Sequence, residues 1–124
     1  MSAHPSYDYR VEVVRVVDGD TLDLRVDLGF YTSMTMRFRL LGVDTPERRE
    51  QGWSDASLFT AGWLEARKGL LRARTAKADS FGRWLADVYA TPTGIDGVVS
   101  EAGVDVRQHL SDDLIRTGHG KAML

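Results

Sequence analysis

The sequence contains no cysteine among its 124 residues. Disulfides and thiolate metal sites are therefore excluded, and any metal ion must bind to oxygen or imidazole ligands. No stretch approaches the roughly 18 apolar residues of a membrane-spanning helix, so we expect no membrane partner. The N-terminus lacks the basic and apolar regions of a signal peptide. This favours a cytoplasmic protein, with secretion after removal of a signal as the alternative.

The chain also lacks the surplus of positive charge that is typical of nucleic-acid-binding proteins. Its formal net charge is −2, but residues 31–90 carry ten Lys or Arg against seven Asp or Glu. We interpret most of these charges as solvated faces of strands and helices. Hydrophobic residues make up 43% of the chain and charged residues 27%, the ordinary balance of a globular protein with one core.

Hydrophobic patterns predict three strands in the first part of the chain. Residues 11–17 are rich in β-branched side chains, and Asp18-Gly19 predicts a type I′ hairpin turn after them. Strict alternation at 22–28 and 34–40 predicts two half-buried strands. Ser54 is then expected to cap a helix that runs to about residue 68.

Two further strands and a helix are predicted in the second part. Residues 71–77 and 83–90 show strand patterns, and residues 106–117 fit a helix that Gly118 ends. The order predicts an α+β, mainly β domain. A five-stranded Greek-key OB-fold barrel, with a helix between strands 3 and 4 and a C-terminal helix, accommodates it. We expect residues 1–9 to be a disordered lead-in and residues 10–124 to be a single domain.

Four segments combine carboxylates, arginines and turn residues: Asp18-Gly-Asp-Thr21, Arg39, Asp44-Thr-Pro-Glu47 and Asp79-Ser-Phe-Gly-Arg83. Taken singly, each has a structural interpretation as a turn, a strand end or an exposed strand arginine. Together, in this order and spacing, they closely resemble the motifs of the staphylococcal-nuclease family, which is built on an OB-fold. The resemblance covers roughly residues 10–122.

The resemblance implies a calcium site. Asp20 and Asp44 would be ligands, and the backbone carbonyl of Thr45 would complete the protein's share. Such hard oxygen ligands suit calcium, whose remaining positions water and a substrate phosphate can fill.

The resemblance also implies a reaction, the hydrolysis of DNA or RNA phosphodiester bonds to 3′-phosphate and 5′-hydroxyl ends, with a preference for single strands. Glu47 would position or deprotonate the attacking water. Arg39 and Arg83 would hold the scissile phosphate, because the planar guanidinium group binds two phosphate oxygens at once.

The chain departs from the family pattern around the substrate. Ser80 replaces a lysine that secreted members often carry, and the loop after Glu47 is short. Arg48 and Arg49 in that loop are candidate phosphate ligands, with an exposed loop pair as the alternative. Tyrosines that contact the nucleotide in longer members are missing, so we expect weaker substrate binding.

Base stacking would then need other aromatic residues. The candidates are Phe30, Tyr31, Trp53 and Trp84, each of which has core or rim packing as its alternative interpretation.

Two other functions compete with the nuclease. One is a non-catalytic OB-fold module that binds single-stranded nucleic acid or a protein partner. The other is a nuclease that is active only within an assembly. The family's further terminal helix is missing here, and this predicts an apolar barrel face that a second subunit could cover in a homo-oligomer.

Overall fold

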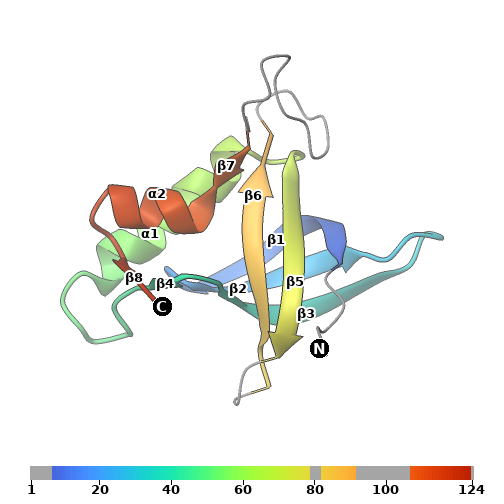
Figure 1. Cartoon of the computed structure of the whole chain (residues 1–124). Coiled ribbons are helices and arrows are strands. Elements are labelled where there is room, and N and C mark those ends of the chain that lie inside the picture. The colour runs from blue at the N-terminus through green and yellow to red at the C-terminus, as the bar shows by residue number, and fades with distance from the viewer. Residues whose placement is uncertain (1–6, 79–81, 92–106, 124) are drawn as a thin grey trace, which may run out of the picture.

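The computed structural model describes residues 7–78, 82–91 and 107–123, with the backbone only at 77 and 78. Its centre is a closed barrel (Figure 1). The barrel strands are β1 (Asp8–Asp18), β2 (Thr21–Asp27), β3 (Ser33–Leu40), β5 (Leu71–Ala78) and β6 (Trp84–Ala90). Neighbours pair in the order β3-β2-β1-β5-β6, and a parallel pairing of β3 with β6 closes the ring. This is the topology of the predicted OB-fold, and the α+β class is confirmed.

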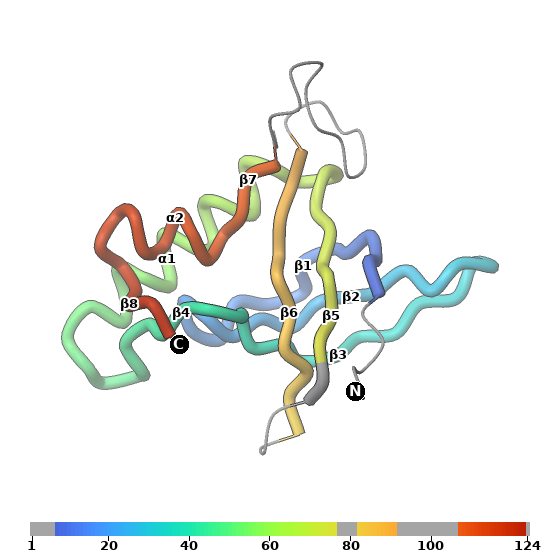
Figure 2. The backbone as a smooth tube through the Cα atoms, in the orientation of Figure 1, coloured from blue at the N-terminus to red at the C-terminus, as the bar shows by residue number. Residues whose placement is uncertain are grey.

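Two helices and three short strands complete the described part of the chain. Helix α1 (Trp53–Ala66) lies between the third and fourth barrel strands, as predicted, and α2 (Leu110–Arg116) packs beside it. Strand β7 (Gln108–His109) extends the sheet at β6, while β4 (Val43–Asp44) pairs with β8 (Lys121–Ala122). Both helices lie on one side of the barrel (Figures 1 and 2). No helix in the described ranges is long and apolar enough to span a membrane.

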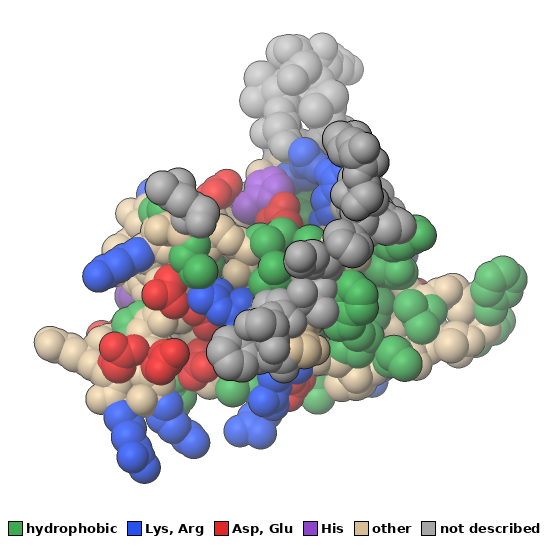
Figure 3. Space-filling model, turned by 60° about the horizontal axis from the view of Figure 1, so that its bottom comes forward, with side chains coloured by type: hydrophobic (Ala, Val, Ile, Leu, Met, Phe, Trp, Pro, Cys, Tyr) green, Lys and Arg blue, Asp and Glu red, His purple; other side chains and the backbone are tan. Residues whose placement is uncertain are grey.

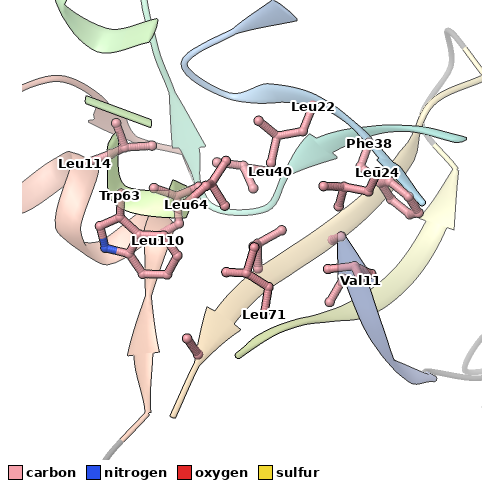
Figure 4. Close-up of a cluster of buried hydrophobic side chains, with 14 of the residues drawn as sticks. Val11, Leu22, Leu24, Phe38, Leu40, Trp63, Leu64, Leu71, Leu110 and Leu114 are labelled. Carbon is pink, nitrogen blue, oxygen red and sulfur yellow. The ribbon is translucent and has the colours of Figure 1, made fainter. Parts of the chain in front are cut away.

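The alternating residues of the barrel strands form the core. Leu22 and Leu24 of β2 and Phe38 of β3 are at most 1% exposed, and they point into the barrel (Figure 4). Leu110 and Leu114 of α2 are equally buried. Each such side chain contributes about 1.5–3 kcal/mol when fully buried. The hydrophobic contacts therefore fix both the barrel and the helices that lie on one side of it.

The structure corrects two predicted boundaries. Strand β1 begins at Asp8, where Asp8 and Tyr9 pair with Arg74 and Ala73 of β5, so the predicted lead-in of residues 1–9 is too long. Residues 1–6 lie outside the described part. Helix α2 begins at Leu110 because the two residues before it pair with β6 instead.

The predicted cap of α1 is wrong. Ser54 lies inside the helix, which begins at Trp53 after Gly52, and no side chain caps it. Gly52 adopts a left-handed conformation with φ of 92°. That conformation is accessible to glycine without a steric penalty, and it turns the preceding loop into the helix axis.

The β1–β2 turn also differs from the prediction. Its central residues are Gly19 and Asp20, and neither has the positive φ that a type I′ turn requires. Gly19 is needed for space instead. A Cβ atom there would lie 2.9 Å from Thr45 Oγ1 and 3.0 Å from the Cβ of Ala56. The turn therefore packs directly against the segment after β4 and against α1.

Positive φ values occur at the other end of β2. The turn from Gly29 to Thr32 has Phe30 and Tyr31 as its central residues, with φ of 56° and 61°. The Thr32 N–H donates to the Gly29 carbonyl at 2.9 Å. Left-handed backbone costs a non-glycine residue roughly 1–2 kcal/mol. The tip of the β2–β3 hairpin is therefore held in a conformation that its residues disfavour.

Two glycine substitutions separate close packing from backbone entropy. Gly19→Ala should destabilise the protein by about 1–3 kcal/mol, because the added methyl group overpacks against Thr45 and Ala56. Gly62→Ala in α1 should stabilise it by about 0.5–1 kcal/mol, because a Cβ there meets nothing within 4 Å. Urea denaturation of both variants measures the two changes. A stability loss at Gly62 matching that at Gly19 would contradict this account.

Candidate metal and phosphodiester site

The carboxylate of Asp20 is the buried centre of the candidate site. Asp20 is 6% exposed in the turn between β1 and β2. Its Oδ2 accepts the backbone N–H of Thr45 at 2.9 Å, and its Oδ1 accepts the Thr21 hydroxyl at 3.0 Å. The side chain thus ties the first hairpin turn to the segment that follows β4.

Arg39 connects Asp20 to the second predicted ligand. It lies on the outer side of β3, opposite Thr21 of β2. Its Nη1 donates to the Val43 carbonyl at 2.8 Å and lies 3.4 Å from Asp20 Oδ2. Its Nη2 donates to Asp44 Oδ1 at 3.2 Å. One guanidinium group therefore lies between Asp20 and Asp44. The fold thus brings together two motifs that are far apart in the sequence.

Asp44 and Thr45 differ in exposure. The Asp44 side chain is 57% exposed at the end of β4, whereas Thr45 is buried. The Thr45 hydroxyl has no hydrogen-bond partner in the described part of the chain, and its backbone N–H binds Asp20. Asp44 can therefore reach a ligand from solvent, while Thr45 holds the strand end in place.

The next loop carries Glu47 and both predicted loop arginines on the surface. Glu50 closes this loop by accepting the Glu47 N–H at 2.6 Å and donating its own N–H to the Glu47 carbonyl at 2.9 Å. Within the described residues, the carboxylate of Glu47 makes no hydrogen bond or ion pair. The carboxylate is thus open to solvent.

The two loop arginines do not converge on the aspartates. The guanidinium of Arg48 lies 5.5 Å from the centre of the Trp53 ring, and Trp53 Nε1 donates to Asp18 at 2.6 Å. Arg49 is exposed and has φ of 78°. Arg48 therefore helps to hold the loop against α1.

Arg83 precedes β6, the parallel neighbour of β3. In this pairing Leu85 stands opposite Arg39, so Arg83 lies two residues further toward the start of both strands. The inward positions of β6 are those of Ala86 and Val88. Alternation therefore places half-buried Arg83 on the outer side of the barrel, as Arg39 is on β3. Ser80 lies outside the described residues.

One more arginine on β3, Arg37, is occupied by a carboxylate. Its Nε and Nη2 donate to the two carboxylate oxygens of Asp23 at 2.8 and 3.2 Å. These hydrogen bonds hold the pKa of Asp23 below its usual value. Arg37 is therefore paired with Asp23, and Arg39 is the β3 arginine that contacts Asp20 and Asp44.

Sequence reasoning missed the strand at the C-terminal end of the described chain. Lys121 of β8 pairs with Asp44, and Met123 Sδ lies 3.3 Å from Arg39 Nη2. A hollow of about 380 Å³ opens beside this strand and is lined by Asp44, Thr45, Glu50, His119 and Lys121, among others. On the half of the molecule that carries the helices, at the left of Figure 3, acidic and basic side chains lie next to one another. A two-residue strand has no alternation by which it could have been predicted.

The donor set fits a hard cation, although no group of three or more acidic, histidine or cysteine side chains forms a metal cluster in the described ranges. The predicted set has only two carboxylates, from Asp20 and Asp44, and a backbone carbonyl. The guanidinium of Arg39 already places positive charge between those carboxylates. Carboxylate and carbonyl oxygens are calcium ligands, and the exposure of Asp44 leaves room for water.

Two curated proteins are similar to this chain. Protein ParB of Escherichia coli is 35% identical over 88 residues, which cover 70% of this chain and 46% of that protein. A micrococcal nuclease of Shigella flexneri is 35% identical over 83 residues, covering 67% and 44% of the two proteins. The chain thus spans less than half the length of these relatives. No model of a known protein family matches it.

The two aspartates should contribute differently to stability. Asp20→Ala should cost about 1–3 kcal/mol in a chelating buffer, because the buried Thr45 N–H loses its acceptor. Asp44→Ala should cost less than about 1 kcal/mol, because its ion pair is exposed. Urea denaturation of both variants provides the measurement. Equal losses would show that Asp20 is not the buried junction described above.

Proposed function

Because this chain belongs to the family of the micrococcal, or staphylococcal, nucleases, we propose that it is a calcium-dependent nuclease acting on DNA or RNA. One observation carries the proposal. The guanidinium group of Arg39 joins Asp20 and Asp44, which are the residues that two separate motifs predict as ligands. This convergence supports a site for a cation and a phosphate. The exposed carboxylate of Asp44 is not needed to stabilise the fold, so its place beside Arg39 favours a functional role.

The charges of the site explain its need for a metal ion. Three carboxylates (Asp20, Asp44 and Glu47) and two guanidinium groups (Arg39 and Arg83) give a formal charge of −1. A phosphodiester is repelled by such a site. Calcium, held by Asp20, Asp44 and the Thr45 carbonyl, would supply positive charge that stabilises the more negative transition state.

The two terminal nitrogens of the Arg39 guanidinium group have different hydrogen-bond partners. Nη1 is anchored by the carbonyls of Val43 and Leu40, at 2.8 and 3.2 Å. Nη2 contacts only Asp44 and the sulfur of Met123 in the described part of the chain. Exchange of the exposed Asp44 contact for a phosphate oxygen would leave the anchor intact. Arg83, just before the neighbouring strand β6, would bind a second oxygen of the same phosphate.

Glu47 is the proposed proton acceptor. Its exposed carboxylate can accept a proton from water while the water oxygen bonds to phosphorus. The bond from phosphorus to the 5′ oxygen then breaks, that oxygen takes up a proton from solvent water, and Glu47 releases to solvent the proton it accepted. The products are a 3′-phosphate and a 5′-hydroxyl. A single strand is the expected substrate, since its backbone can bend into the hollow beside Lys121.

Cleavage of an end-labelled single-stranded DNA oligonucleotide tests the reaction. We expect calcium-dependent products with 3′-phosphate ends and no cleavage with a chelator. Glu47→Gln should lower the rate by about 10²–10⁴-fold, the range for a lost general base. Glu65→Gln on the exposed face of α1 is the matched control and should cleave normally. A folded protein that binds the oligonucleotide without cleaving it would instead be a non-catalytic OB-fold module.

Calcium titration tests the ligands separately from the reaction. Asp20→Ala and Asp44→Ala should weaken calcium binding and activity together, whereas Glu47→Gln should bind calcium normally and turn over slowly. Calorimetry of the folded variants measures the affinities. Unchanged calcium affinity in Asp20→Ala would make the ligand assignment wrong, whatever its activity.

A further inference from the structure

The tip of the β2–β3 hairpin carries two aromatic side chains that lie outside the hydrophobic core. Phe30 is 98% exposed and Tyr31 111% exposed, which excludes the core and rim packing considered for them above. Leu28 and Met34 beside them are also exposed. The hairpin projects away from the helices in Figure 1, and hydrophobic side chains gather at the end of this arm in Figure 3.

The backbone of the tip disfavours these two residues. Both central positions of the turn have positive φ, which asparagine and glycine adopt readily and aromatic residues do not. Phe30 and Tyr31 therefore destabilise the hairpin by their conformation and gain no burial in return. Strain without compensating packing points to a function at the strained residues.

Three arginines and two carboxylates are among the residues that line a hollow beside this tip. This hollow of about 430 Å³ is lined by Tyr31, Arg10, Arg25 and Arg72, together with Glu12 and Asp27 among others. Arg25 pairs with Glu12, and both side chains are largely exposed, at 49% and 70%. Exposed ion pairs contribute little to stability, so a phosphate can replace Glu12 at Arg25. The volume is in the range of small-ligand pockets.

We propose that the hairpin tip is a second contact for single-stranded nucleic acid, remote from the candidate cleavage site. Phe30 and Tyr31 stack on bases, and Arg25 in the adjacent hollow binds a neighbouring phosphate. Stacking suits any sequence, because every base has a π-face. Exposed rings beside guanidinium groups fit this ligand better than an apolar protein surface. The inference rests on the proposed function, since the ligand is its substrate.

The barrel allows one single-stranded nucleic acid to reach both the candidate cleavage site and the aromatic tip. Strand β2 runs from the turn that holds Asp20 to the aromatic tip, and both ends are visible in Figure 2. An OB-fold binds about 4–16 nucleotides, depending on the protein. A long substrate can therefore occupy the site and the tip together, whereas a dinucleotide occupies only the site.

Phe30→Asn combined with Tyr31→Gly tests the proposal, because this pair favours the observed turn while removing both rings. Binding of an oligothymidylate of about 16 nucleotides, the upper site size above, is followed by fluorescence anisotropy. The measurement uses calcium and a Glu47→Gln background that prevents cleavage. We expect roughly five-fold weaker binding or more, from the loss of base stacking. The thermal midpoint should stay the same or rise.

Two controls isolate the rings. Phe30→Tyr with Tyr31→Phe keeps both rings and should bind like the parent, and Leu58→Gln removes an exposed apolar side chain elsewhere, on α1. With Glu47 restored, the variant that carries Phe30→Asn and Tyr31→Gly should cleave a dinucleotide as the parent does. Undiminished binding of the long oligomer by this variant overturns the proposal, as does an effect confined to self-association.

The same measurements distinguish a failure of the nuclease proposal from a failure of the tip-contact proposal. If the parent never cleaves, but the Phe30→Asn and Tyr31→Gly variant binds the oligomer more weakly than the parent, the tip contact is supported and the nuclease activity is ruled out. A parent that cleaves, with equal oligomer binding in both proteins, retains the nuclease and removes the tip contact. A parent that binds no oligomer removes the tip contact as well.

Discussion

The arrangement of the site depends on how the buried charge of Asp20 is compensated. A carboxylate this far from solvent is costly unless hydrogen bonds and opposite charge surround it. The Thr45 N–H, the Thr21 hydroxyl and the guanidinium of Arg39 provide them, and each comes from a different strand or strand end. The same contacts that make the carboxylate tolerable thus fix the relative positions of β2, β3 and β4.

Much of the barrel follows from local pattern. The alternation through Leu22 and Leu24, and through Phe38 and Leu40, is a direct consequence of one strand face packing inward, and those residues are buried as expected. Boundaries were less predictable because distant pairings set them. Asp8 joins β1 only because β5 lies beside it, and Gln108 joins the sheet through β6.

The same distinction applies to the site. Motif order predicted that Asp20, Arg39 and Asp44 would come together, since these residues lie at strand ends that the OB-fold makes neighbours. It could not predict Met123 against Arg39, because that contact depends on a two-residue strand pairing. Nor could it decide whether Phe30 was buried, since hydrophobicity alone does not distinguish a core residue from an exposed functional one.

Arg39 has a further consequence for how the fold accommodates the carboxylates of Asp20 and Asp44. Many small metal-binding domains unfold when a chelator removes the ion, because the free energy of metal binding is part of their free energy of folding. Here the guanidinium group of Arg39 lies between the two carboxylates, and a cluster of buried hydrophobic side chains forms the core. We therefore expect the fold to persist whether or not an ion is bound, since the chain itself supplies the charge between these carboxylates.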